Sequence, residues 1–199
     1  MEITWVNGKK MLNTKNANYS FGALHDVMQF ALREAALKGD EHILLLGLGA
    51  GSVIHIVREE FQLKNKITAV ELDAKIIELA KKEFYLDKHE NIEIICADAY
   101  PYVLQEIKKY DLIIIDLFID NKVPEQFYDE LFWKNILRIT KHDGGIIFNT
   151  MIHNRESDII KFISDRIKDA GLEVTIHRHI ETNIVLIAKG KINSKSDIQ

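Results

Sequence analysis

Three acidic side chains directly follow aliphatic runs of this chain. Glu71 ends "ITAVE", Asp98 follows "IEIICA" and Asp116 ends "DLIIID". Aspartate and glutamate are poor strand formers and are seldom buried without a partner. One such residue would be an ordinary polar loop residue. Three of them, together with a glycine-rich loop, predict a ligand-binding site.

The glycine-rich loop lies in "LLLGLGAGS", where Gly47, Gly49 and Gly51 are spaced GxGxG. Dinucleotide-binding loops space their glycines as GxGxxG, and the third glycine lets the helix approach the strand. Ser52 stands at that third position in this chain. The loop therefore fits a cofactor without a pyrophosphate at least as well as a dinucleotide, and the glycines alone do not decide between them.

The acidic residues indicate where such a cofactor would lie. In an open α/β sheet the ligand lies at the carboxyl ends of the strands, near the point where the strand order reverses. Glu71 follows Gly51 by twenty residues, the spacing at which a carboxylate accepts hydrogen bonds from ribose hydroxyls. We expect Asp98 to meet an adenine amino group and Asp116 to face the reacting end of the cofactor.

Strands and helices alternate along the part of the chain that carries these residues. Continuous aliphatic strands are expected where helices cover both faces of a parallel sheet. The last two strands, "LEVTIHRH" and "TNIVLIAK", are joined by a link too short for a parallel crossover. The expected class is α/β, a Rossmann-like methyltransferase fold whose doubly wound, mostly parallel seven-stranded sheet ends in an antiparallel hairpin. The other strands are expected near 43–47, 67–71, 92–96, 111–116 and 144–149, and helices near 52–61, 74–85, 100–109, 125–139 and 155–169.

The length of 199 residues allows one domain with a good core. "ITWVNGKKMLNT" predicts a hairpin ahead of it, turning at Asn7-Gly8. This hairpin and an apolar helix at 22–38 could form the face of a homodimer, or the same residues could simply cover the sheet. The expected parts are a short N-terminal β-hairpin at 1–17, a catalytic domain that binds the cofactor at 18–190, and a flexible tail at 191–199.

Composition excludes several classes of function. A net charge of −4 and a pI of about 6.1 argue against a nucleic-acid partner. The apolar runs are shorter than a membrane span and the N-terminus lacks a signal peptide's apolar core. We therefore expect a cytoplasmic protein that has no membrane partner. Cys96 can form no internal disulfide and is expected to be a buried strand residue.

The histidines do not suggest a metal site. His153, His177 and His179 are scattered around the last strands and loops without the spacing of metal ligands. His55, in "VIHIV", is expected on a helix face with no role in function. We therefore expect no metal.

The whole pattern resembles the S-adenosylmethionine-dependent methyltransferase superfamily and, within it, the spermidine synthase branch. The resemblance covers about residues 18–152. Each motif is weak alone, and the combination is specific. The motifs are "LLLGLGAGS", "AVELDAKIIELAKK", "ICADAY", "YDLIIIDLF" with "VPEQFYDELFWKNI", and "GGIIFNT".

The resemblance implies an adenosyl cofactor, S-adenosylmethionine or its decarboxylated form, bound at the glycine loop without a metal. Glu71 would hold the ribose. Asp98 would hold the adenine together with the backbone beside Ala99, and Pro124 would line the adenine side.

The resemblance also implies an amine substrate. Asp116 matches the aspartate that accepts the amine's proton in spermidine synthases. His25, in "LHD", is similar to a histidine of a "YHE" segment that would approach the amine. Asp120, in "DLFIDNKVP", is an approximate match to the second aspartate of a DSSDP-like run.

One departure from the family bears on the donor. Spermidine synthases carry GGGDG in the loop, and this chain has Ala50 in place of that aspartate. Losing a carboxylate that meets a cationic aminopropyl group removes a charge-assisted hydrogen bond. Ala50 therefore favours ordinary S-adenosylmethionine, which carries its own carboxylate.

The expected function is transfer of a methyl or aminopropyl group from a sulfonium donor to a small acceptor, expected to be an amine. One alternative is a true polyamine aminopropyltransferase that uses decarboxylated S-adenosylmethionine. Another is a non-catalytic protein that binds an adenosyl cofactor. The GxGxG spacing and the terminal hairpin disfavour a nicotinamide oxidoreductase. The sequence names neither the acceptor nor the group transferred.

Overall fold

The structure is a computed structural model that describes residues 2–6, 9–13, 23–119, 122–151, 156–180 and 183–190. The strands are β1 (Glu2–Val6), β2 (Lys9–Asn13), β3 (His42–Leu46), β4 (Lys66–Glu71), β5 (Ile92–Cys96), β6 (Tyr110–Ile115), β7 (Thr140–Met151), β8 (Leu172–Ile180) and β9 (Asn183–Gly190). The α-helices are α1 (Ala23–Ala35), α2 (Ser52–His55), α3 (Ala74–Glu83), α4 (Ala99–Gln105), α5 (Glu130–Ile139) and α6 (Glu156–Asp169). A π-helix, η1 (Ile56–Glu60), continues α2, and η2 (Leu86–Lys88) and η3 (Glu125–Tyr128) are 3₁₀-helices.

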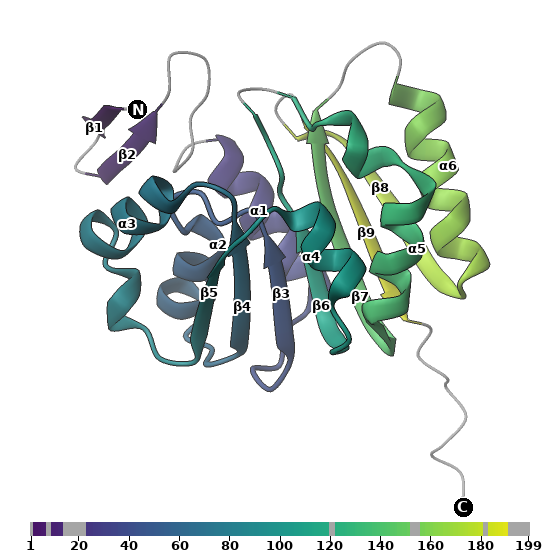
Figure 1. Cartoon of the computed structure of the whole chain (residues 1–199), viewed down its shortest axis with the longest axis horizontal. Coiled ribbons are helices and arrows are strands. Elements are labelled where there is room, and N and C mark those ends of the chain that lie inside the picture. Colours follow the sequence, from purple (N-terminus) through teal and green to yellow (C-terminus); the bar gives the residue numbers. More distant parts are fainter. Residues whose placement is uncertain are drawn as a thin grey trace, which may run out of the picture.

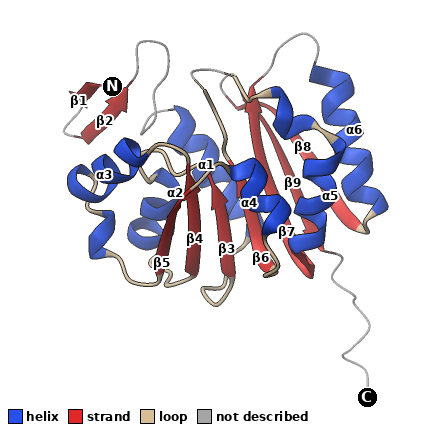
Figure 2. Cartoon of the chain, in the orientation of Figure 1, coloured by secondary structure: helices blue, strands red, loops and turns tan. Residues whose placement is uncertain are grey.

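The expected α/β fold is confirmed. One seven-stranded sheet has the order β5-β4-β3-β6-β7-β9-β8 (Figures 1 and 2). Neighbouring strands from β5 to β7 are parallel, whereas β9 is antiparallel to both β7 and β8. The strand order reverses between β3 and β6. Their carboxyl ends therefore flank the position where this fold class binds ligands.

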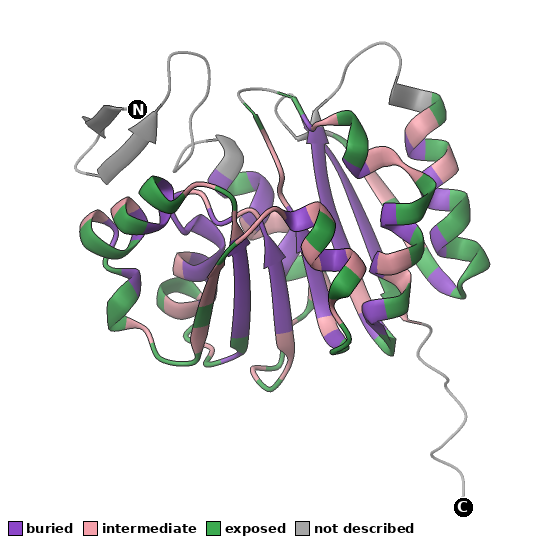
Figure 3. Ribbon diagram, in the orientation of Figure 1, coloured by how far each residue is buried: buried purple, intermediate pink, exposed green. Residues whose placement is uncertain are grey.

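Two apolar layers enclose the sheet because successive strand residues point to opposite faces. Leu44 and Leu46 of β3 pack with α4, α5 and α6, whereas Ile43 and Leu45 pack with α1, α2 and α3. The central strands are buried along most of their length (Figure 3). Burial on both faces explains why these strands are continuous aliphatic runs.

Some element boundaries differ from those expected. The single helix expected at 125–139 is divided at Asp129, whose carboxylate accepts a hydrogen bond from the backbone N–H of Phe132 (2.7 Å). Aspartate at this position caps a helix N-terminus, so α5 starts afresh there. Strand β7 begins at Thr140, before the expected 144, because Tyr110 pairs with Thr140 ahead of a register shift.

Cys96 corrects another expectation. It lies at the end of β5, the edge strand of the sheet, and its side chain is exposed. An edge strand has a neighbour on one side only, so an apolar run there need not be fully covered. The prediction of a buried cysteine was wrong.

At the N-terminus, β1 and β2 pair antiparallel, from Glu2 with Asn13 to Val6 with Lys9, as the expected hairpin requires. The predicted Asn7-Gly8 turn and the 191–199 tail lie outside the described residues. Among the described helices none has the length and apolar character needed to cross a membrane.

Candidate active site

The glycine loop connects β3 to α2 and lies between the ends of β4 and β6. The Gly47 N–H donates to the carbonyl of Val70 at 2.9 Å. A Cβ at Gly47 would lie 2.9 Å from the carbonyl carbon of Asp116 and closer still to its oxygen. Gly47 also has a positive φ of 92°, which side-chain-bearing residues rarely adopt. Only a glycine at position 47 therefore allows the loop to pass this close to Asp116.

The end of the loop is also tightly packed. Gly51 has a φ of 87°, and a Cβ there would come 2.6 Å from Leu86. Leu86 itself is buried. The GxGxG spacing of the sequence thus matches close backbone approaches at the first and the third glycine.

Glu71 ends β4 and holds this loop by hydrogen bonds. Its Oε2 accepts from the N–H groups of Leu48 (3.1 Å) and Gly49 (3.2 Å), and its Oε1 accepts from the N–H of Asp73 (3.0 Å). An ionised carboxylate offers about four acceptor positions. Glu71 can therefore keep the loop in place and still accept a hydrogen bond from a ligand hydroxyl.

Asp98 follows β5 and caps α4. Its Oδ1 accepts from the N–H of Tyr100 at 2.9 Å, which gives this aspartate a structural role besides the predicted one. Ala99 is buried as the first residue of α4, and Pro124 precedes η3. Glu71 and Asp98 thus place carboxylate acceptors at the ends of the neighbouring strands β4 and β5, where the hydroxyl and amino groups of an adenosyl moiety could donate to them.

Asp116 follows β6 beside the glycine loop. Its N–H donates to the carbonyl of Leu46 (2.9 Å), and its Oδ1 accepts from Nδ2 of Asn149 (2.8 Å). Burial raises the pKa of Asp116 to about 6, against the smaller opposite effect of the Asn149 hydrogen bond. A carboxylate with a pKa in that range is suited to exchange protons near neutral pH.

A chain of two amides supports Asp116, and the sequence analysis did not anticipate it. Asn149 is fully buried on β7, and its Oδ1 accepts from Nδ2 of Asn183 on β9 at 2.8 Å. This bond fixes which end of the Asn149 amide faces Asp116. The available signal was a polar residue inside the aliphatic run "GGIIFNT", since buried amides need partners.

The roles predicted for the two substrate residues, His25 and Asp120, both remain predictions. His25 is buried on α1 with its Nε2 2.7 Å from Oε1 of Glu60 on η1. Its role toward an amine stays a prediction. Asp120 lies outside the described residues, so its predicted role is equally open.

The family follows from a comparison with known domains. The model of the spermine/spermidine synthase domain matches residues 25–190. The chain belongs to the spermine/spermidine synthase family. The expected branch of the methyltransferase superfamily is therefore confirmed.

Curated relatives of this chain are named as aminopropyltransferases or methyltransferases. A polyamine aminopropyltransferase of Methanocaldococcus jannaschii is 29% identical over 139 residues, which cover 67% of this chain and 46% of that protein. The chain thus spans about half the length of this curated relative.

Two solved structures share the fold. A probable spermidine synthase from Corynebacterium glutamicum has a TM-score of 0.72 at 20% identity, covering 96% of this chain and 74% of that one. Human methyltransferase-like protein 13, solved in complex with SAH, has a TM-score of 0.69 at 23% identity, with 88% and 86% covered.

Ala50 is the point at which this member of the spermine/spermidine synthase family departs from the expected loop. Its side chain is buried between Gly49 and Gly51. The loop of this chain therefore places no carboxylate at that position.

Proposed function

We propose that this chain is a transferase that uses an adenosyl sulfonium donor to alkylate a small amine. The observation that carries the proposal is Asp116: a partly buried carboxylate with a pKa raised to about 6, placed against the glycine loop. Membership of the spermine/spermidine synthase family supports the same class of reaction.

In this proposal Glu71 and Asp98 bind the donor, and Asp116 takes part in proton transfer. A bound sulfonium donor supplies an activated carbon and a neutral thioether leaving group. Glu71 and Asp98 would hold the ribose and the adenine. This fixes the carbon for in-line attack, and such alignment alone lowers barriers by several kcal/mol.

Asp116 would accept the proton of the nucleophile. The amine lone pair forms the new carbon–nitrogen bond as the carbon–sulfur bond breaks, and the bonding electrons remain on sulfur. A protonated amine has no free lone pair, so a base within hydrogen-bond reach is required. Asn149 donates to Oδ1 of Asp116, which leaves Oδ2 as the atom to take the proton.

Ala50 bears on the identity of the group moved. An aminopropyl group carries an ammonium charge, and a loop carboxylate would stabilise it by a charge-assisted hydrogen bond. Because Ala50 cannot do so, we favour methyl transfer from S-adenosylmethionine over aminopropyl transfer. The same absence of a loop carboxylate favours a second candidate, a protein that binds the cofactor without turnover.

The test supplies S-adenosylmethionine or its decarboxylated form together with a panel of small amines. S-Adenosylhomocysteine indicates methyl transfer and methylthioadenosine indicates aminopropyl transfer. Asp116→Asn should lower the rate at least about 100-fold, the lower range of general base contributions. Asp143→Asn, an exposed aspartate paired with His142, should leave the rate unchanged.

The outcomes separate the candidates. Transfer by Asp116→Asn at the parent's rate would show that Asp116 is not the base. A thermal shift with the donor but no product with any amine would favour the non-catalytic binder.

A further inference from the structure

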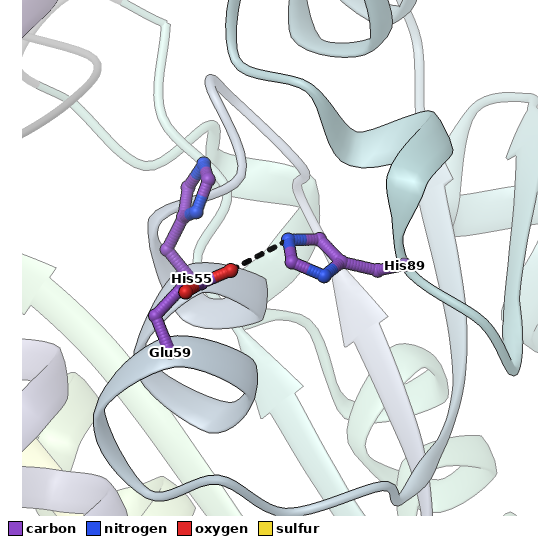
Figure 4. Close-up of side chains that lie close together, drawn as sticks. All are labelled: His55, Glu59 and His89. Atoms are coloured by element: carbon purple, nitrogen blue, oxygen red, sulfur yellow. Dashed lines mark ion pairs between the residues drawn. The ribbon is translucent and has the colours of Figure 1, made fainter.

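A cluster of His55, Glu59 and His89 lies outside the site described above. His55 ends α2, Glu59 belongs to η1 and His89 directly follows η2 (Figure 4). One candidate ligand atom from each side chain lies within 4.8 Å of the others. The sequence does not reveal this cluster because thirty residues separate Glu59 from His89.

Local structure brings the first two ligands to one side. His55 and Glu59 are four residues apart on one continuous helical segment, so their side chains are neighbours. The segment passes from α-helix to π-helix here, with Phe61 N–H bonded to the Ile56 carbonyl at 2.9 Å. Single π-turns within helices occur frequently at functional sites.

The third ligand is already close to the distance that a metal requires. His89 Nε2 lies 3.5 Å from Oε1 of Glu59. Zinc bonds of about 2.0–2.2 Å in a tetrahedron place ligand atoms roughly 3.4 Å apart. The two imidazole rings meet edge to face, 5.8 Å between centroids. The ligand atom of His55 lies within 4.8 Å of the other two, so metal binding would bring the three side chains closer together.

His55 also has the outer contact typical of a ligand. Its ring hydrogen-bonds the backbone of Phe84. Metal-binding histidines commonly donate their second nitrogen to a backbone carbonyl or a carboxylate.

We propose that His55, Glu59 and His89 form a binding site for a divalent transition metal, with zinc the best match. Two imidazoles and one carboxylate are a known zinc ligand set, and the fourth position is left for water. The ion would join η1 to the segment after α3, whose Leu86 packs against Gly51. This proposal is independent of the transfer reaction.

Zinc titration of the chelator-treated protein tests the site, with calorimetry for stoichiometry and the absorption of Co²⁺ for geometry. We expect one zinc per chain and Co²⁺ bands of a tetrahedral site. Glu59→Gln and His89→Gln should each weaken zinc binding at least about tenfold, since loss of an outer contact alone costs that much. His142→Gln is the matched control, because His142 is exposed and paired with Asp143.

Folding controls distinguish the loss of a metal ligand from the loss of the folded state. Thermal melting without metal checks that each variant folds, and the exposed Glu59 provides a second test where His89→Gln fails to fold. Equal zinc affinity in the parent and Glu59→Gln would overturn the site. So would absence of stoichiometric binding, or loss of binding in His142→Gln.

Discussion

Asp116 combines two properties at the scale of a single residue. It lies where the strand order reverses, and its carboxylate is held by a buried amide. Burial opposes its ionisation, whereas the Asn149 hydrogen bond supports it. The balance leaves a pKa of about 6, so Asp116 is mostly ionised at neutral pH yet remains a stronger base than an exposed aspartate.

Removing the amide should change the pH dependence of transfer. In Asn149→Ala the ionised carboxylate loses its donor, so the pKa of Asp116 rises further above 6. A hydrogen bond to a charged group is worth about 1.5–3 kcal/mol, roughly one to two pH units. The midpoint of the rate profile should move to higher pH by about that amount.

Asn183→Ala should shift the pH midpoint less than Asn149→Ala. Asn183 donates to Asn149, which in turn donates to Asp116, so its loss should move the same midpoint in the same direction by a smaller amount. An unchanged midpoint in Asn149→Ala would contradict the role given to this amide chain.

At the scale of elements, the glycine loop packs directly against the backbone at the end of β6. Glu71 holds the loop from β4 through three backbone N–H groups. Asp129 similarly joins α5 to α4, since it caps α5 and accepts from the Tyr100 hydroxyl at 2.6 Å. These contacts position the site before any ligand binds.

Gly47→Ala should lower the stability of the protein far more than Gly171→Ala, although the two glycines have similar φ values. Gly47 and Gly171 have φ values of 92° and 94°, so both substitutions incur about 1–2 kcal/mol of backbone strain. A Cβ at Gly171 would have no atom within 4 Å, whereas one at Gly47 would meet the Asp116 carbonyl.

Urea unfolding of both variants gives the comparison. We expect Gly47→Ala to lose at least about 2 kcal/mol more stability than Gly171→Ala, in the range measured for overpacked sites. Equal losses would mean that the loop can move away from β6.

At the scale of the whole molecule, the raised pKa of the partly buried Asp116 makes the stability of the fold depend on pH. The folded-state pKa of Asp116, about 6, lies above its ordinary value of 3.8. Between these values the folded chain binds more protons than the unfolded chain, so stability falls as pH rises. The stabilisation from the proton that Asp116 holds in the folded state is complete below about pH 4 and is lost above about pH 6.

Asp116→Asn should therefore stabilise the protein at neutral pH. Relative to the parent, its free energy of unfolding should gain about 2–3 kcal/mol between about pH 4 and about pH 7.5. Urea unfolding at the two pH values measures this difference. Asp143→Asn should show no such gain, and a parallel response of both variants would contradict the raised pKa of Asp116.

The order of strands and helices, the terminal hairpin and the glycine loop could be predicted from the sequence, because each depends on periodicity or spacing within a short stretch. The placing of Glu71, Asp98 and Asp116 at one edge followed from the fold class. Less could be predicted where a residue's surroundings come from distant segments, as for Cys96 on its edge strand.

The alternating elements and the acidic residues at the strand ends follow from the amino-acid sequence, because aliphatic runs and glycine spacing act locally. The contacts of Asn183 with Asn149 and of His89 with Glu59 arise only when the chain is folded. Those contacts join residues thirty or more positions apart. Hydrogen bonds and metal ligation depend on distances of a few ångströms, and packing of the whole chain sets those distances.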